Sequence, residues 1–130
     1  MTTPLPYRDA IDRYFAALNA GRREEWINCF APEGGIEDPA GSSPRVGRAS
    51  LGAMYDAFMA ALAGVDFRPT AVYVCGDSAA VSWRAGLMAR SGQTTVCDGI
   101  DLFAFNGTGQ IVKVTGYWDP AAAFHSLGLA

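Results

Sequence analysis

Three side chains in this sequence could together move a proton at a carbon atom: Asp38, Tyr14 and Asp101. Asp38 precedes Pro39 in a turn signature, where a carboxylate partly removed from water can act as a general base. Tyr14 lies on the apolar stripe of an expected helix and carries a phenol that can donate a hydrogen bond. Each feature alone is common, because Asp before Pro often starts a turn and such a Tyr often belongs to a core.

Asp101 is the unusual member of this set because it lies inside a strand-like apolar run, 96–105. Alternation along a strand puts its side chain on the same side as Phe103 and Phe105. An ionised carboxylate on an apolar face is costly unless it is paired, and keeping the proton avoids that cost. A neutral carboxyl group can donate a hydrogen bond, so Asp101 and Tyr14 would supply two O–H donors to one ligand oxygen.

Together these groups fit proton transfer at a carbon next to a carbonyl group. Asp38 would remove the proton, and the two donors would stabilise the enolate oxygen that develops. This chemistry requires no metal and no organic cofactor. The sequence contains no cluster of metal ligands, no Walker loop and no dinucleotide fingerprint. Its one histidine, His125, is expected at the surface of the C-terminal tail.

Length and composition predict a single compact domain over 1–130, because half of the residues are apolar. The net charge is −3 and no basic cluster is present, which argues against nucleic acid or an anionic membrane as a partner. The three cysteines are expected as buried free thiols, with Cys75 and Cys97 in apolar surroundings. The N-terminal segment 1–6 lacks the features of a signal peptide and no apolar run is long enough to span a membrane, so we expect a soluble, cytoplasmic protein.

Hydrophobic periodicity and turn signals predict the elements that must position these residues. The expected helices span 7–20, 22–30 and 50–62, and the expected strands lie around Ile36 and near 66–75, 79–90, 93–105 and 111–118. A short closing helix is expected after Asp119-Pro120. The sequence therefore predicts an α+β fold, with three N-terminal helices packed on a curved, mainly antiparallel sheet. A strongly bent sheet wrapped on helices leaves a cone-shaped cavity.

An ordered set of residues links the chain to a known family. The set is Arg13-Tyr14-Phe15-Ala16-Ala17-Leu18-Asn19-Ala20-Gly21, Ile36-Glu37-Asp38-Pro39-Ala40-Gly41, Gly47, Tyr55, Ile100-Asp101 and Tyr117-Trp118. In these residues and their spacing, the sequence resembles the bacterial ketosteroid isomerases. That family belongs to the nuclear-transport-factor-2-like (NTF2-like) superfamily of cone-shaped α+β domains. The resemblance covers nearly the whole chain and is strongest over roughly its first half.

The resemblance implies a cofactor-independent steroid delta-isomerase, which moves a C=C bond of a 3-keto-Δ5-steroid into conjugation. Asp38 matches the family's general base, whereas Tyr14 and a protonated Asp101 match its oxyanion hole. The ketosteroid isomerases are themselves the standard example of a carboxylic acid kept neutral in order to donate, so this role comes from the resemblance. Tyr55 matches a tyrosine that hydrogen-bonds to Tyr14, and Trp118 matches an aromatic side chain near the base. A homodimer formed through the sheet is also implied.

Some positions depart from the family pattern. Phe30 stands where some members have another tyrosine, so the hydrogen-bonded chain is expected to be shorter here. Alternate positions counted back from the turn at Ser91-Gly92 put Arg84, Gly86 and Met88 at the pocket wall. Because Gly99 and Gly116 also fall at wall positions, the cavity is expected to be wider than a steroid needs. The expected substrate-binding residues are Tyr55, Met88, Phe103, Gly116 and Trp118.

Other function classes remain open. If Arg84 faces inward, it could pair with Asp101 and create an Asp–Arg–Asp arrangement like that of the limonene-epoxide hydrolases of the same superfamily. Aldol ring closure of the polyketide-cyclase kind also uses a carboxylate base in such a cone. A non-catalytic module that holds a hydrophobic ligand is the third class, since this fold is reused for binding.

Overall fold

The structure is a computed structural model, and it describes residues 6–129. The expectation about the N-terminal segment therefore lies almost entirely outside the described residues. The elements are α1 (Pro6–Ala20), α2 (Arg23–Ile27), β1 (Phe30–Glu37), β2 (Arg45–Val46), α3 (Arg48–Ala60), β3 (Leu62–Cys75), β4 (Ser78–Ala89), β5 (Thr94–Phe105), β6 (Ile111–Tyr117) and α4 (Pro120–Ser126). Asp119 caps α4, because its side chain accepts a hydrogen bond from the backbone N–H of Ala122.

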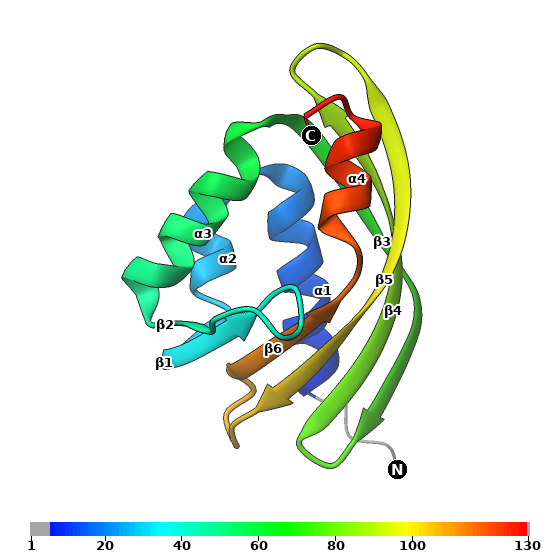
Figure 1. Ribbon diagram of the computed structural model, residues 1–130. Helices are drawn as coiled ribbons and strands as arrows, with labels where there is room; N and C mark the ends of the chain where they lie inside the picture. The colour runs from blue at the N-terminus through cyan, green and yellow to red at the C-terminus, as the bar shows by residue number, and fades with distance from the viewer. Residues whose placement is uncertain (1–5, 130) are drawn as a thin grey trace.

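One six-stranded sheet forms the frame of the molecule, in the order β2-β1-β6-β5-β4-β3. Its strands β3 to β6 form an antiparallel meander, as the turn signals predict. Strand β1 pairs parallel to β6 and antiparallel to β2, so the sheet is mixed. The sheet curves around the first three helices, and α4 lies across one end of the concave side (Figure 1). The expected α+β cone with a curved sheet is therefore confirmed.

The helices and the sheet are less segregated along the chain than expected. Helix α2 ends at Ile27, whereas the sequence predicted a helix as far as Phe30. Phe30 instead opens β1 opposite Ile111, whose N–H donates to the Cys29 carbonyl oxygen at 2.9 Å. Pairing with a strand some 80 residues away thus overrides local helical periodicity, and both β1 and β2 fall between α2 and α3.

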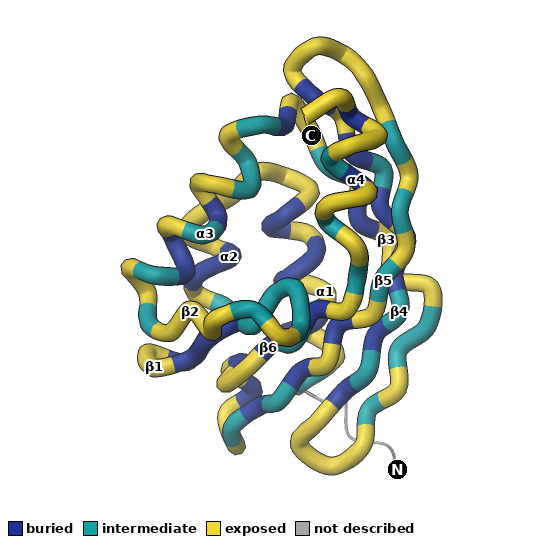
Figure 2. The backbone as a smooth tube through the Cα atoms, viewed as in Figure 1, coloured by how far each residue is buried: buried dark blue, intermediate teal, exposed yellow. Residues whose placement is uncertain are grey.

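Strand β4 presents the opposite face to the one the sequence analysis assigned. Its buried residues are Ala79, Val81, Trp83, Ala85, Leu87 and Ala89. Arg84 and Met88 therefore point away from the helices, and Met88 is 44% exposed in a separate surface depression. Its predicted place at the pocket wall is wrong. Alternation fixes which residues share a face, but packing against the helices decides that the bulky Trp83 set faces inward. Figure 2 shows buried positions alternating with less buried ones along this strand.

The cysteines are less buried than predicted. Cys75 is exposed because it ends β3 beside the turn to β4, and Cys29 and Cys97 are half-buried. All three are free thiols, as expected. Across residues 6–129, no helix combines the length and the apolar character that a membrane crossing demands.

Candidate active site

A cavity of about 280 Å³ lies between the helices and the concave face of the sheet. Most of its wall is aromatic or aliphatic, and its two charged side chains are Asp38 and Asp101. Tyr14, Tyr55 and Trp118 also line it. The structure therefore brings the three predicted catalytic residues and two of the predicted binding residues to one cavity. No group of three or more His, Cys, Asp or Glu side chains suited to a metal ion occurs between residues 6 and 129.

Asp38 follows β1, and β6 holds it in place. The N–H of Ala40 donates to the carbonyl oxygen of Gly116 at 2.6 Å, which ties the turn after Asp38 to β6. A Cβ atom on Gly116 would lie 2.7 Å from the Cγ atom of Asp38, so only glycine leaves room for this carboxylate. Gly116 was predicted to bind substrate, but its position identifies it as the support of Asp38.

The environment of Asp38 suits a base. Burial raises the pKa of its carboxyl group, while the Trp118 Nε1–H donates to Oδ1 at 2.6 Å and lowers it. The neighbouring Glu37 points elsewhere, as alternation predicts. Its carboxylate accepts the Gly41 N–H at 2.8 Å and lies 3.5 Å from Lys113 Nζ, and both contacts lower its pKa. The pKa values of these two adjacent carboxyl groups are thus shifted in opposite directions.

Asp101 is the one charged residue of the described core, with 5% of its surface exposed. Burial first, and then the negative charge of Asp38, raise the pKa of its carboxyl group from 3.8 to about 7. Arg84 gives it no counter-charge, because the Arg84 guanidinium lies outside the sheet and donates to Asp98 at 2.9 Å. Asp101 therefore keeps its proton to a much higher pH than an ordinary carboxyl group, which is the direction expected for a carboxyl group on an apolar face.

Tyr14 projects from α1 into the same cavity and is 3% exposed. Burial first, and then the charges of Asp101 and Asp38, raise the pKa of its phenol well above the ordinary value, so it remains a donor. Phe103 packs edge-to-face on its ring at 5.2 Å between centroids. Phe103 thus supports Tyr14 from behind and lies outside the cavity lining, contrary to its predicted contact with substrate.

Trp26 occupies the place where the sequence analysis expected a contact between two tyrosines. The ring of Trp26 lies 5.8 Å from that of Tyr14 and 5.7 Å from that of Tyr55, and Tyr55 makes no hydrogen bond to Tyr14. Phe30 packs edge-to-face on the same indole at 5.1 Å. The sequence analysis did not include Trp26 among the candidate site residues. The sequence does indicate that Trp26 lies on the buried side of α2. It does not indicate that the indole packs against Tyr14.

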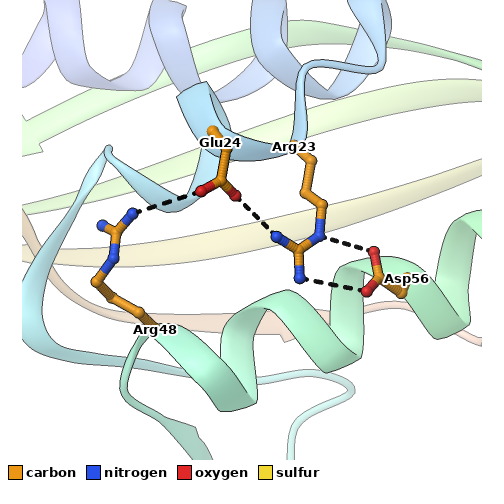
Figure 3. Close-up of polar contacts among 4 residues, drawn as sticks. All are labelled: Arg23, Glu24, Arg48 and Asp56. Atoms are coloured by element: carbon orange, nitrogen blue, oxygen red, sulfur yellow. Dashed lines mark hydrogen bonds and ion pairs between the residues drawn. The ribbon is translucent and has the colours of Figure 1, made fainter.

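Exposed ion pairs hold α2 against α3 where Trp26 meets Tyr55. Arg23 binds both carboxylate oxygens of Asp56, at 2.8 and 3.2 Å, and Glu24 bridges Arg23 and Arg48 (Figure 3). Because these side chains are exposed, each pair contributes only about 0–1 kcal/mol to stability. Their main effect is geometric, since they align the two helices that carry the aromatic contacts.

Trp83 makes the cavity narrower than the sequence analysis expected. Its indole lies across β5 at Gly99, where a Cβ atom would come within 2.7 Å of the ring. The ring also packs against Phe67 at 5.1 Å and Trp118 at 5.9 Å. The missing side chain at Gly99 therefore makes room for an indole and adds no space for a ligand. Trp83 thus forms part of the cavity wall, although the sequence analysis did not include it among the candidate site residues.

This fold and this site define a class: a cone-shaped NTF2-like domain with carboxyl groups and a phenol in an apolar cavity. Residues 11–114 match the SnoaL-like domain family, and the chain belongs to that family. More particularly, it is 31% identical over 111 residues to the steroid delta-isomerase of Nocardioides simplex, across 85% of this chain and 88% of that protein. The resemblance to ketosteroid isomerases is thereby supported.

Solved structures give the same fold. The epoxide hydrolase/cyclase-like enzyme SalBIII, with a role in pyran ring formation in the polyether salinomycin, matches with a TM-score of 0.79 at 22% identity, over 88% of this chain and 92% of its own. A protein from Catenulispora acidiphila, described as having a ketosteroid isomerase-like fold, matches with a TM-score of 0.84 at 19% identity, over 99% of this chain and 96% of its own. At these identities the likeness concerns the fold alone.

Proposed function

We propose that this protein is a cofactor-independent steroid delta-isomerase that converts a 3-keto-Δ5-steroid into its conjugated Δ4 isomer. The observation that carries the proposal is the convergence of Asp38, Tyr14 and Asp101 on one apolar cavity with different proton affinities. The likeness to the steroid delta-isomerase of Nocardioides simplex supports the same reaction. Membership of the SnoaL-like domain family does not by itself select the substrate.

The reaction follows from the chemistry of these groups. Asp38 takes a proton from carbon 4, and the electrons of that C–H bond form the C3=C4 bond of an enolate conjugated with C5=C6. Tyr14 and protonated Asp101 donate to the enolate oxygen at carbon 3 as its negative charge develops. Asp38 then returns the proton to carbon 6, and the double bond moves to C4=C5. The proton count balances without a cofactor.

The small aromatic cavity favours a flat substrate. Its volume of about 280 Å³ lies near the lower end of the range for ligand pockets, roughly 300–1,000 Å³. The aromatic walls at Phe67, Trp83 and Trp118 provide apolar contact and no charge to a bound ring system. These features suit a fused-ring ketone better than a bulky, polar or branched ligand.

The alternative functions, namely epoxide hydrolysis, aldol ring closure and ligand binding without catalysis, have weaker support. Epoxide hydrolysis through an Asp–Arg–Asp arrangement needs Arg84 in the cavity, but Arg84 is exposed and bound to Asp98. No contact of the described residues specifically favours aldol ring closure. A pure binding module would have no use for a carboxyl group whose pKa is raised to about 7 beside a second buried carboxyl group.

The test is an ultraviolet assay that follows the conjugated enone formed from 5-androstene-3,17-dione. We expect turnover by the wild type, none above background for Asp38→Asn, and a large loss of kcat for Asp101→Leu with a smaller change in KM. Asp98→Asn is the matched control, because Asp98 lies on the same strand and faces outward. Wild-type protein that binds the steroid without converting it would refute the isomerase and leave a binding role.

We also propose that the protein forms a homodimer through the outer face of the sheet. Exposed apolar side chains gather there, at Tyr73, Met88, Val96, Ile100, Leu102 and Tyr117. Cross-strand pairing places Ile100 beside Tyr117, so they form one patch. Sedimentation velocity should give a dimer for the wild type and a monomer for Ile100→Asp. A wild-type monomer at high concentration would refute this assembly without bearing on the reaction.

A further inference from the structure

Two buried indole N–H groups have no hydrogen-bond partner in the described structure. They belong to Trp26 and Trp83, and both indoles border the candidate active site. A buried donor without an acceptor costs free energy, and such groups are rare in folded proteins. The third indole of the chain differs, since the Trp118 N–H donates to Asp38. The two unpaired donors therefore call for an explanation that ordinary core packing does not give.

Trp26 is the close neighbour of the first candidate donor. Its ring lies 5.8 Å from that of Tyr14 and is fixed on its other sides by Phe30 and Tyr55. Burial dominates the raised pKa of the Tyr14 phenol, and the Trp26 N–H acts in the opposite direction and lowers it. The N–H therefore lies near the phenol oxygen, although the two atoms do not meet hydrogen-bond geometry in the free protein.

Trp83 stands in the same relation to the second candidate donor. It pairs across the strands with Gly99, which lies two residues before Asp101 on the same face of β5. Burial and the charge of Asp38 raise the pKa of Asp101, whereas the Trp83 N–H lowers it. Here too the N–H lies near an oxygen without completing a hydrogen bond. Both candidate donors thus have an indole N–H directly behind them.

We propose that Trp26 and Trp83 are positioning residues, each completing an N–H···O hydrogen bond to Tyr14 or Asp101 when a ligand presents a negatively charged oxygen. The physical reason is cooperativity. An O–H group that donates to an anion gains electron density on its own oxygen, which then becomes a better acceptor for a second donor. The unpaired indoles of the free protein become paired as charge develops. This inference rests on the proposed oxyanion hole and names residues whose N–H groups act on it through Tyr14 and Asp101.

The first test observes the indoles directly and does not require turnover. The sequence has three tryptophans, so a ¹⁵N-indole spectrum should hold three side-chain signals, assigned with Trp→Phe variants. We would titrate the protein with 2-naphthol, whose ionised form mimics an enolate oxygen, and with naphthalene, which has no oxygen. We expect the N–H protons of Trp26 and Trp83 to move downfield with 2-naphthol and not with naphthalene. The Trp118 signal should respond alike to both.

The second test measures affinity. Trp26→Phe and Trp83→Phe each keep an aromatic ring and remove the N–H, so we expect each to weaken 2-naphthol binding about threefold to tenfold. The ionised fraction of bound 2-naphthol should fall as well, and affinity for naphthalene should fall less than affinity for 2-naphthol, because both indoles line the cavity. Phe67→Leu is the control, because it alters packing against Trp83 without removing a donor. It should weaken both probes equally.

The outcomes separate this inference from the proposed function. Equal loss of both probes in the Trp→Phe variants, or indole signals that stay in place with 2-naphthol, would overturn the positioning role and leave the oxyanion hole intact. If the wild type binds naphthalene as well as 2-naphthol and ionises none of the latter, the oxyanion hole itself fails. The inference then falls with the function on which it rests.

Discussion

Replacing Asp101 by Asn should remove one large contribution to the pH dependence of stability between mildly acidic and neutral pH. In the folded protein the pKa of this carboxyl group rises from 3.8 to about 7, chiefly because it is buried. The unfolded chain releases this proton near pH 4, whereas the folded chain keeps it to about pH 7. The folded state therefore binds more protons across that window, and wild-type stability must fall as pH rises through it.

The magnitude follows from the two pKa values. Their difference of about 3 pH units, at about 1.4 kcal/mol for each, is worth about 4 kcal/mol between roughly pH 4 and pH 8. That is a large share of the 5–15 kcal/mol typical of a whole domain. Above about pH 8 the contribution is constant, because both states are then ionised. An Asn side chain has no proton to lose, so this contribution disappears in the variant.

The assay is urea unfolding at closely spaced pH values for the wild type, Asp101→Asn and Asp98→Asn. We expect the gap in unfolding free energy between wild type and Asp101→Asn to change by about 4 kcal/mol between roughly pH 4 and pH 8. Asp98→Asn is the matched variant, because it removes a carboxyl group from the outer face of the same strand. Parallel curves for Asp101→Asn and wild type would refute the claim that burial holds the proton on Asp101.

Other perturbations test the supports of the site. Gly116→Ala should displace the Asp38 carboxylate, lower activity by about 100-fold and cost about 1–3 kcal/mol of stability, which steady-state kinetics and thermal melts would measure. Unchanged kinetics would contradict this placement. Gly99→Ala should push Trp83 into the cavity, weaken naphthalene binding and quench or shift tryptophan fluorescence. Trp118→Phe removes the N–H that stabilises ionised Asp38, so the pKa of Asp38 should rise and the acidic limb of the kcat/KM profile should move to higher pH. A limb that stays in place would count against that hydrogen bond.

Much of the site could be predicted from the sequence alone, because the patterns that indicate it span only a few neighbouring residues. The alternation in β5 put Asp101 on the side of Phe103 and Phe105, and burial agrees at each position. A carboxyl group on such a face has few options, so its raised pKa was also predictable. The Asp-Pro turn after a short strand placed Asp38 at the cavity, and the apolar stripe of α1 placed Tyr14.

The wrong predictions concern features that depend on contacts between segments far apart in the sequence. In β4, alternation left two possible faces, and the analysis assigned Met88 to the wrong one and left the orientation of Arg84 open. Pairing across the strands resolves this choice, since Arg84 lies opposite Asp98 and Trp83 lies opposite Gly99. Residues opposite each other in an antiparallel pair share a face, so an outward Asp98 requires an outward Arg84. The prediction of a wider cavity was wrong because the space at the two glycines is filled by other side chains. Trp83 lies over Gly99, and Asp38 lies over Gly116.

The sequence by itself determined most of the elements, the antiparallel meander and the residue types that can move a proton. Periodicity, turn chemistry and the cost of a buried charge act over a few residues. Only the tertiary structure decided how these groups are supported. It placed Trp26 behind Tyr14 and Trp83 over Gly99, and it gave Asp38 the space left by Gly116. These contacts join residues far apart in the chain, and they depend on close packing between elements, which local patterns do not encode.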